Sequence, residues 1–149
     1  MTSVAKWSVC EAQSHAQIDR CFPVMHQLRT ALTREEFIRR VITQQTDGYR
    51  LVFLEAGESI GCVAGFRITR CLAWGQFLYV DDLVTDASSR SKGYGKIMLD
   101  WLRDEARRTH CDQFHLDSGI QRTEAHRFYL REGMELSSYH FADPLKSPQ

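Results

Sequence analysis

The sequence predicts one α/β domain with a mixed sheet, antiparallel in its first part and parallel in a central pair, and with helices on both faces. Its 149 residues, 43% of them hydrophobic and 26% charged, have the proportions of a single globular domain. Three strand-like segments are separated by short turns that contain glycine, which indicates antiparallel pairing. A strand, helix, strand order then follows, and such a crossover makes its two strands parallel. We expect an ordered core over residues 7–141 and a loose tail over residues 143–149.

The first third of the chain is predicted to be helical after a short strand at Trp7–Cys10. Apolar residues at helical spacing predict a helix over His15–Arg29, which Pro23 kinks or restarts. Thr33 begins a capping-box pattern ahead of a second apolar stripe, so a second helix is expected to end near Asp47–Gly48.

The rest of the chain predicts the sheet and its crossover. The three antiparallel strands are expected at residues 49–55, 61–71 and 76–84, and a helix over Gly93–Arg108 leads to a strand at Gln113–Ser118. The third and fourth strands are then parallel neighbours. A final helix over Arg122–Arg131 ends near Gly133, and Met134–Phe141 is predicted to be a closing strand.

Charge and composition exclude several function classes. The formal net charge is zero, so no global field attracts a polyanion, and nucleic acid is not an expected partner. No apolar run approaches the ~20 residues that cross a bilayer, and the first residues lack a secretory signal, so we expect no membrane association and a cytoplasmic location. The five scattered cysteines and six histidines form no paired spacing, so neither a disulfide framework nor a metal site is expected.

A polar segment between the third strand and the following helix concentrates the chemistry. Two glycines there allow a tight turn and close approach of the backbone to a ligand, and free N–H groups at a helix start attract an anion. These features predict a pyrophosphate cradle, with a tight turn that binds nothing as the alternative. The dinucleotide fingerprint fails at Met98, where a small residue is required, and the Walker motif lacks its Ser or Thr after the lysine. The segment consists of Arg90, Ser91, Lys92, Gly93, Tyr94, Gly95 and Lys96.

The chain resembles the GNAT superfamily of N-acetyltransferases in three linked pieces, which together cover Trp7–Phe141. A strand over Leu78–Thr85 runs into the glycine-containing segment, as in that family's acetyl-CoA-binding strand, loop and helix. The two early helices before a hairpin match its substrate-covering segment. Its late helix is similar to the segment that contains Ala125, Phe128, Tyr129 and Gly133.

The resemblance implies a sheet that is splayed between the two parallel strands, with acetyl-CoA in the gap and no metal. The backbone of Leu83, Val84 and Thr85 would pair with the pantetheine, and the amides of Arg90–Gly95 would hold the pyrophosphate. Many family members have Asn where this chain has Arg122, so the contact from the last helix to the cofactor stays open.

Two proton-handling groups are needed, because the amine must attack uncharged and the departing thiolate must be stabilised. The resemblance assigns thiolate protonation to Tyr129, whose alternative role is that of a core aromatic residue. Asp81 and Asp82 are the candidate bases. Neighbouring strand positions face opposite sides, so we expect only one of them to point inward, and which one is left open. The lesser candidates are Tyr79, Asp117 and His126.

The resemblance therefore implies transfer of an acetyl group from acetyl-CoA to a primary amine of a small molecule or peptide, by direct attack in a ternary complex. A regulatory module of the same fold that binds acyl-CoA without turnover is the alternative, and a different acyl donor is a third interpretation. The early arginines at positions 29, 34, 39 and 40 are interpreted as a solvated helix face, with a site for an acidic substrate as the alternative. The predicted final strand would allow a homodimer, and the oligomeric state is left open.

Overall fold

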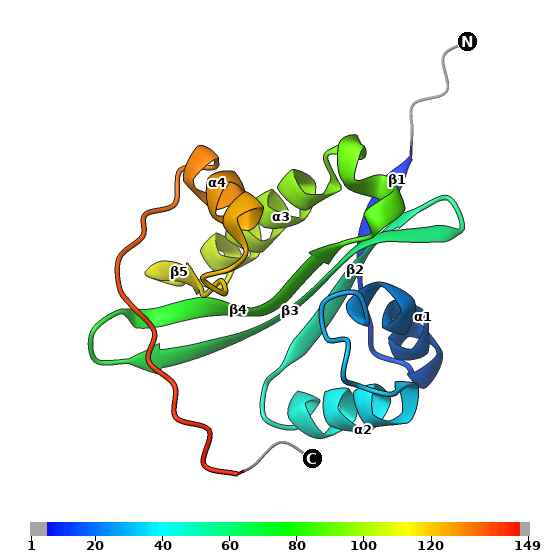
Figure 1. Ribbon diagram of the computed structural model, residues 1–149, viewed down its shortest axis with the longest axis horizontal. Helices are drawn as coiled ribbons and strands as arrows, with labels where there is room; N and C mark the ends of the chain where they lie inside the picture. Colours follow the sequence, from blue (N-terminus) through cyan, green and yellow to red (C-terminus); the bar gives the residue numbers. More distant parts are fainter. Residues whose placement is uncertain (1–5, 147–149) are drawn as a thin grey trace. The chain divides into compact units, whose positions relative to one another are not determined.

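The computed structural model describes residues 6–146 of the chain, which divides into two compact units, Met1–Leu116 and Asp117–Gln149. The first unit contains a five-stranded sheet in the order β1-β2-β3-β4-β5 (Figure 1). The first four strands are antiparallel and β5 runs parallel to β4, which confirms the predicted mixed sheet. The strands are β1 Trp7–Glu11, β2 Arg50–Ala56, β3 Ser59–Cys71, β4 Gly75–Thr85 and β5 Gln113–Leu116.

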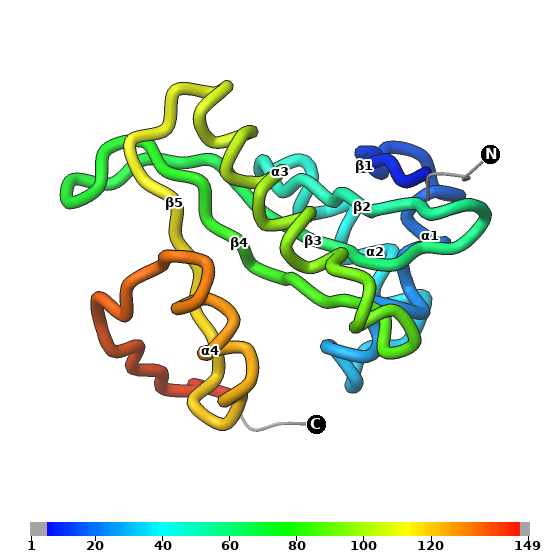
Figure 2. The backbone as a smooth tube through the Cα atoms, turned by 90° about the horizontal axis from the view of Figure 1, so that it is seen from above, coloured from blue at the N-terminus to red at the C-terminus, as the bar shows by residue number. Residues whose placement is uncertain are grey.

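Helices cover both faces of this sheet, as predicted. Alternate residues of β2 point to opposite faces, so Leu51 and Phe53 pack with α1 and α2, whereas Val52 and Leu54 pack with α3. Seen from above in Figure 2, α3 lies over the strands of the sheet. No helix within residues 6–146 is long and apolar enough to cross a membrane. The helices of this unit are α1 His15–Met25, α2 Arg34–Gln45 and α3 Tyr94–Arg108.

The early helices begin at capping residues and α1 is shorter than predicted. Ser14 and Gln17 form a reciprocal capping box at the start of α1, a signal that the sequence pattern had not identified. Pro23 lies in the last part of α1 and has no N–H for the carbonyl of Asp19. That carbonyl instead accepts a hydrogen bond from Arg34 at 3.2 Å, so α2 compensates for the proline and the helix ends soon after it.

The predicted closing strand at Met134–Phe141 is wrong. The second unit contains α4, Thr123–Arg131, and then irregular chain to the end of the described residues. A strand needs a partner for its backbone N–H and C=O groups, and no other strand occurs within residues 117–146. Apolar residues in this segment are consequently exposed rather than packed on a sheet face, including Leu136, Tyr139 and Phe141.

Candidate active site

Strand β4 has an open edge beyond the point where it pairs with β5. The last parallel pair is Val80 with Leu116, whereas β4 continues to Thr85. Leu83, Val84 and Thr85 pair with β3 on one edge only. Among the described residues no strand covers their other edge, so it can receive an extended ligand as an added strand.

A β-bulge at Asp81 decides where the two candidate carboxylates point. Gly65 of β3 is opposite Asp82 and Phe66 is opposite Val80, so Asp81 is the additional residue on β4. The extra residue interrupts the usual alternation, and both carboxylates line one pocket. The expectation that neighbouring positions send Asp81 and Asp82 to opposite faces is therefore wrong.

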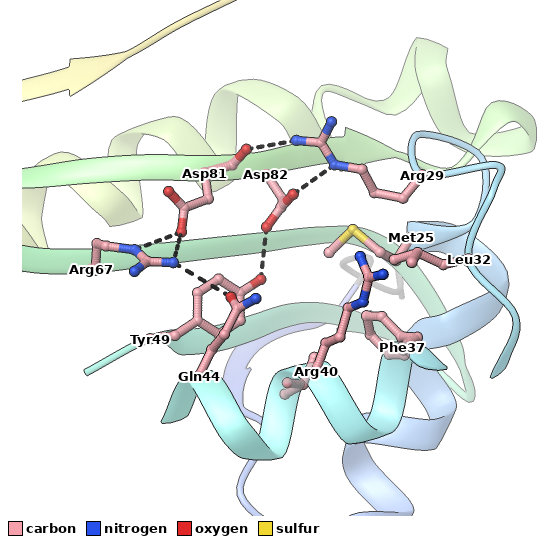
Figure 3. Close-up of a pocket in the computed structure, with 11 residues that line it drawn as sticks. Met25, Arg29, Leu32, Phe37, Arg40, Gln44, Tyr49, Arg67, Asp81 and Asp82 are labelled. Atoms are coloured by element: carbon pink, nitrogen blue, oxygen red, sulfur yellow. Dashed lines mark hydrogen bonds and ion pairs between the residues drawn. The ribbon is translucent and has the colours of Figure 1, made fainter. Parts of the chain in front are cut away.

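The pocket lies between α1, α2 and the sheet, and has a volume of about 260 Å³. Figure 3 shows the two aspartates facing arginine, tyrosine and glutamine side chains across it. Apolar groups from the helices form the remaining wall. The lining residues are Met25, Arg29, Leu32, Phe37, Arg40, Val41, Gln44, Tyr49, Arg67, Asp81 and Asp82.

The two carboxylates differ in how fully they are bonded. One oxygen of Asp82 accepts from Arg29 Nε at 2.8 Å, and its other oxygen accepts from the Tyr49 hydroxyl at 2.8 Å. Both contacts from Arg67 to Asp81, at 2.8 Å and 2.7 Å, go to Oδ2. Oδ1 of Asp81 has no hydrogen-bond partner within residues 6–146 and so is available to a ligand or water.

Burial and neighbouring charges shift two pKa values in this pocket. Burial raises the pKa of Asp81 above its ordinary value, although the Arg67 guanidinium opposes the shift. Burial, with the Asp82 charge, raises the pKa of Tyr49 well above 10.0, so its hydroxyl stays protonated and donates to Asp82. Gly65 makes room for this bond, because a Cβ there would overlap the Tyr49 hydroxyl.

The interpretation of the early arginines as a solvated face is only partly correct. All four arginines are exposed, and Arg34 pairs with Asp19. Arg29 and Arg40 also line the pocket. Sequence patterns do not single out Tyr49 as a site residue, because it begins a predicted strand and its partner Asp82 is 33 residues away in the chain. The available signal for Arg40 was its position three residues after Phe37 on α2, which puts both on the face toward the sheet.

The predicted anion segment spans the end of a short 3-10 helix, η1 Ala87–Lys92, and the start of α3 at Tyr94. Gly93 joins them with a φ of 78° and has open space around the position of a Cβ. No side chain caps the first amides of α3, and the exposed Arg90 and Lys92 have no ion-pair partner among the residues described. Lys96 pairs with Asp100 at 3.0 Å. Uncapped amides and two uncommitted cations suit an anionic ligand.

The Tyr94 side chain belongs to the core rather than to the anion segment. It packs with the cluster under α3, and its ring lies where a Cβ on Gly61 would be. Any contact of Tyr94 with a ligand at this segment would therefore use its backbone.

Gln27, in the connection after α1, bonds to the start of η1, which leads into the anion segment. Its side-chain amide donates to Asp86 at 2.7 Å and accepts from the backbone N–H of Ala87 at 2.9 Å. Hydrogen bonds from Ser88 and Gln27 lower the pKa of Asp86, which keeps it ionised and this junction ordered.

The predicted proton donor Tyr129 lies on α4, in the second unit. It is half-buried, and its ring centroid is 5.4 Å from that of Phe128. Nε2 of the lesser candidate His126 lies 2.8 Å from the carbonyl oxygen of Gly119, so this side chain has a hydrogen-bond partner seven residues away in the chain. No group of three potential metal ligands occurs within residues 6–146.

Two bacterial proteins are similar to this chain in sequence. An uncharacterized N-acetyltransferase of Bacillus subtilis (strain 168), YhdJ, is 38% identical over 126 residues, which span 83% of this chain and 89% of that protein. Aminoalkylphosphonate N-acetyltransferase of Salmonella typhimurium (strain LT2) is 33% identical over 100 residues, 65% of this chain and 62% of that protein.

Solved structures share the fold at low identity. Aminoglycoside N-acetyltransferase AAC(6')-Iy in complex with CoA has a TM-score of 0.82 at 10% identity, and 99% of each chain is covered. Glucosamine-6-phosphate N-acetyltransferase from Arabidopsis thaliana has a TM-score of 0.75 at 21% identity, covering 95% of this chain and 99% of that one. Residues 13–134 match the model of the acetyltransferase (GNAT) family. The match over residues 13–134, together with the relative that is 38% identical, shows that this chain belongs to the GNAT family of acetyltransferases.

Proposed function

We propose that this protein transfers an acetyl group from acetyl-CoA to a primary amine of a small molecule or peptide, by direct attack in a ternary complex. The observation that supports this best is that one strand carries both the pocket carboxylates and the open backbone edge. Asp81 and Asp82 line the pocket, and the next residues of β4, Leu83 to Thr85, form its open edge. The pocket is therefore the proposed amine site.

The residues present fit coenzyme A. The open backbone edge at Leu83, Val84 and Thr85 suits a pantetheine arm, which pairs as an extended strand would. The uncapped start of α3 suits a diphosphate, with Arg90 and Lys92 as counter-charges. The residues that would hold the diphosphate are Arg90, Ser91, Lys92, Gly93, Tyr94, Gly95 and Lys96.

Between the two carboxylates, we propose Asp81 as the proton acceptor. Its Oδ1 is unbonded among the described residues, and its pKa is raised, so it is a better base than an ordinary carboxylate. Both oxygens of Asp82 are already bonded, to Arg29 and to Tyr49. Asp82 thus holds the side chains of Arg29 and Tyr49 in place in the pocket and does not accept the amine proton.

The bound acetyl-CoA supplies an activated acetyl thioester. Asp81 takes one proton of the amine, directly or through a water, so that the nitrogen can form its bond to the acetyl carbon as the carbon–sulfur bond breaks. Tyr129 gives its phenolic proton to the sulfur, because a phenol with an ordinary pKa of about 10 matches a thiolate in basicity. The second proton that the nitrogen loses as it becomes an amide returns to the Tyr129 oxygen, directly or through water. No metal takes part in this proposal.

The test is thiol release from acetyl-CoA by the purified protein, measured with and without a panel of primary amines, together with calorimetric titration of coenzyme A. We expect binding of coenzyme A and release of thiol that depends on the amine. Binding without amine-dependent release would favour the non-catalytic acyl-CoA-binding module. Absence of coenzyme A binding would contradict the proposal as a whole.

A further inference from the structure

The charges of the pocket indicate what else the amine carries. Three arginines and two aspartates line it, so one positive charge is in excess. Arg29 is paired with Asp82 and Arg67 with Asp81. Arg40 has no hydrogen-bond or ion-pair partner in the part of the chain that the structure describes. The excess charge is therefore located on one residue.

Arg40 is positioned to use that charge on a ligand. It follows Phe37 by three residues on α2 and precedes Gln44 by four, so the three side chains lie on one face of the helix. In Figure 3 the Arg40 guanidinium points from α2 into the pocket beside Phe37. Arg39 and Arg40 are both exposed, but only Arg40 is among the residues that line the pocket.

We infer that the acceptor is a small primary amine that also bears an anionic group, a carboxylate, phosphonate or phosphate, and that Arg40 binds this group. The inference rests on the proposed function, in which the pocket receives the amine. A guanidinium offers two parallel N–H donors that match the oxygens of such an anion, which makes the contact strong and directional. The ammonium end of the same molecule is attracted to Asp81 and Asp82. Two-point binding then orients the nitrogen toward the base.

The experiment compares amines that are matched in length and differ in charge. β-Alanine, 2-aminoethylphosphonate and O-phosphoethanolamine carry the anion. Propylamine and ethanolamine have an uncharged group in its place, and these two are called the neutral amines. We expect kcat/KM for thiol release to be at least about tenfold higher with the anionic amines. The order among carboxylate, phosphonate and phosphate identifies which anion the pocket accepts.

Two variants assign the preference to one side chain. Arg40→Gln should raise KM for the anionic amines about tenfold and leave kcat near its original value, with a much smaller change in KM for the neutral amines. Arg39→Gln removes the same charge from the adjacent position and should change neither class. Equal kcat/KM for anionic and neutral amines in the unaltered protein, or equal effects of the two substitutions, would overturn the inference.

Failure of the proposed function gives a different result. If no amine of either class releases thiol, acetyl transfer to these amines is contradicted, and calorimetric titration of the anionic amines in the presence of coenzyme A decides the inference by itself. Binding that Arg40→Gln weakens and Arg39→Gln preserves supports the anion site. Absence of binding overturns it.

Discussion

The two halves of the candidate site are built in different ways. The half that we propose to bind coenzyme A runs from Leu83 to Lys96 and is contiguous in sequence. Its chemistry comes mainly from the backbone, from the open edge of β4 and the uncapped amides of α3. The pocket takes its chemistry from side chains on α1, α2, β3 and β4 and on the connections before and after α2, which are distant in the chain. Asp82, for example, meets Tyr49 and Arg29, which are 33 and 53 residues away.

The two halves should respond differently to substitution. Backbone contacts depend on a few glycines and a helix start, so they tolerate many side-chain changes while they bind the same ligand. Pocket contacts depend on individual side chains, so one substitution changes which molecule fits. We therefore expect substitutions in the two halves to affect different measured quantities.

The largest expected effect is that of Asp81→Asn on catalysis. Removal of a positioned base should lower kcat by about 100-fold or more while coenzyme A affinity stays unchanged. In the unaltered protein kcat/KM should fall as the pH is lowered through the pKa of Asp81, at a higher pH than for an ordinary carboxyl, because that pKa is raised. The pH profile of the variant should lose this limb. A greater loss with Asp82→Asn would show that the two carboxylates have been assigned the wrong way round.

A variant outside both halves should affect stability alone. Glu105 is buried and bonded to Arg50 and Arg108, which lower its pKa from 4.5 to about 2. Its ionised form therefore stabilises the fold above pH 4.5, and the stabilisation is lost as the pH falls toward 2. Glu105→Gln should lower the free energy of unfolding at pH 7 by about 2 kcal/mol, roughly thirtyfold in the folding equilibrium.

Denaturant titrations at pH 7 and pH 3 test this expectation. The difference between the two proteins should shrink at pH 3, and kcat should stay unchanged at a temperature where both are folded. A difference that grows toward low pH would contradict the assigned role of the ion pairs.

Gly93→Ala tests the backbone-built half. Gly93 has a φ of 78°, which an L-residue adopts at a cost of about 1–2 kcal/mol, so the start of α3 should shift. We expect coenzyme A to bind about tenfold more weakly by calorimetry. Gly133→Ala is the matched control, because Gly133 has a φ of 88° and similar open space. It should be similarly destabilised and should bind coenzyme A as the unaltered protein does.

The smallest expected effect is that of Tyr49→Phe on the side-chain-built half. It removes the hydrogen bond to Asp82, so the free energy of unfolding should decrease by about 1 kcal/mol and kcat/KM about fivefold. Coenzyme A affinity should not change. Tyr139→Phe, at an exposed position, should leave all three quantities unaltered. A loss of coenzyme A affinity in Tyr49→Phe would mean that the two halves are not separable.

The order of elements and the anion segment followed from sequence patterns because their determinants are close in the chain. Helical stripes, capping residues and turn glycines act within a few residues, so the predicted strands of the sheet and the helix after Gly93 were confirmed. The same patterns failed at Met134–Phe141, since alternation suggests a strand but does not supply its partner.

The sequence by itself determined that this chain folds as an acetyltransferase of its family, with a turn and helix start suited to an anion. Only the tertiary structure decided how the pocket is made. The bulge that places Asp81 and Asp82 on one side arises from the register between β3 and β4, and the unpaired Arg40 is recognisable only once every neighbouring carboxylate is placed. Register and charge pairing depend on residues brought together by folding, so no local pattern encodes them.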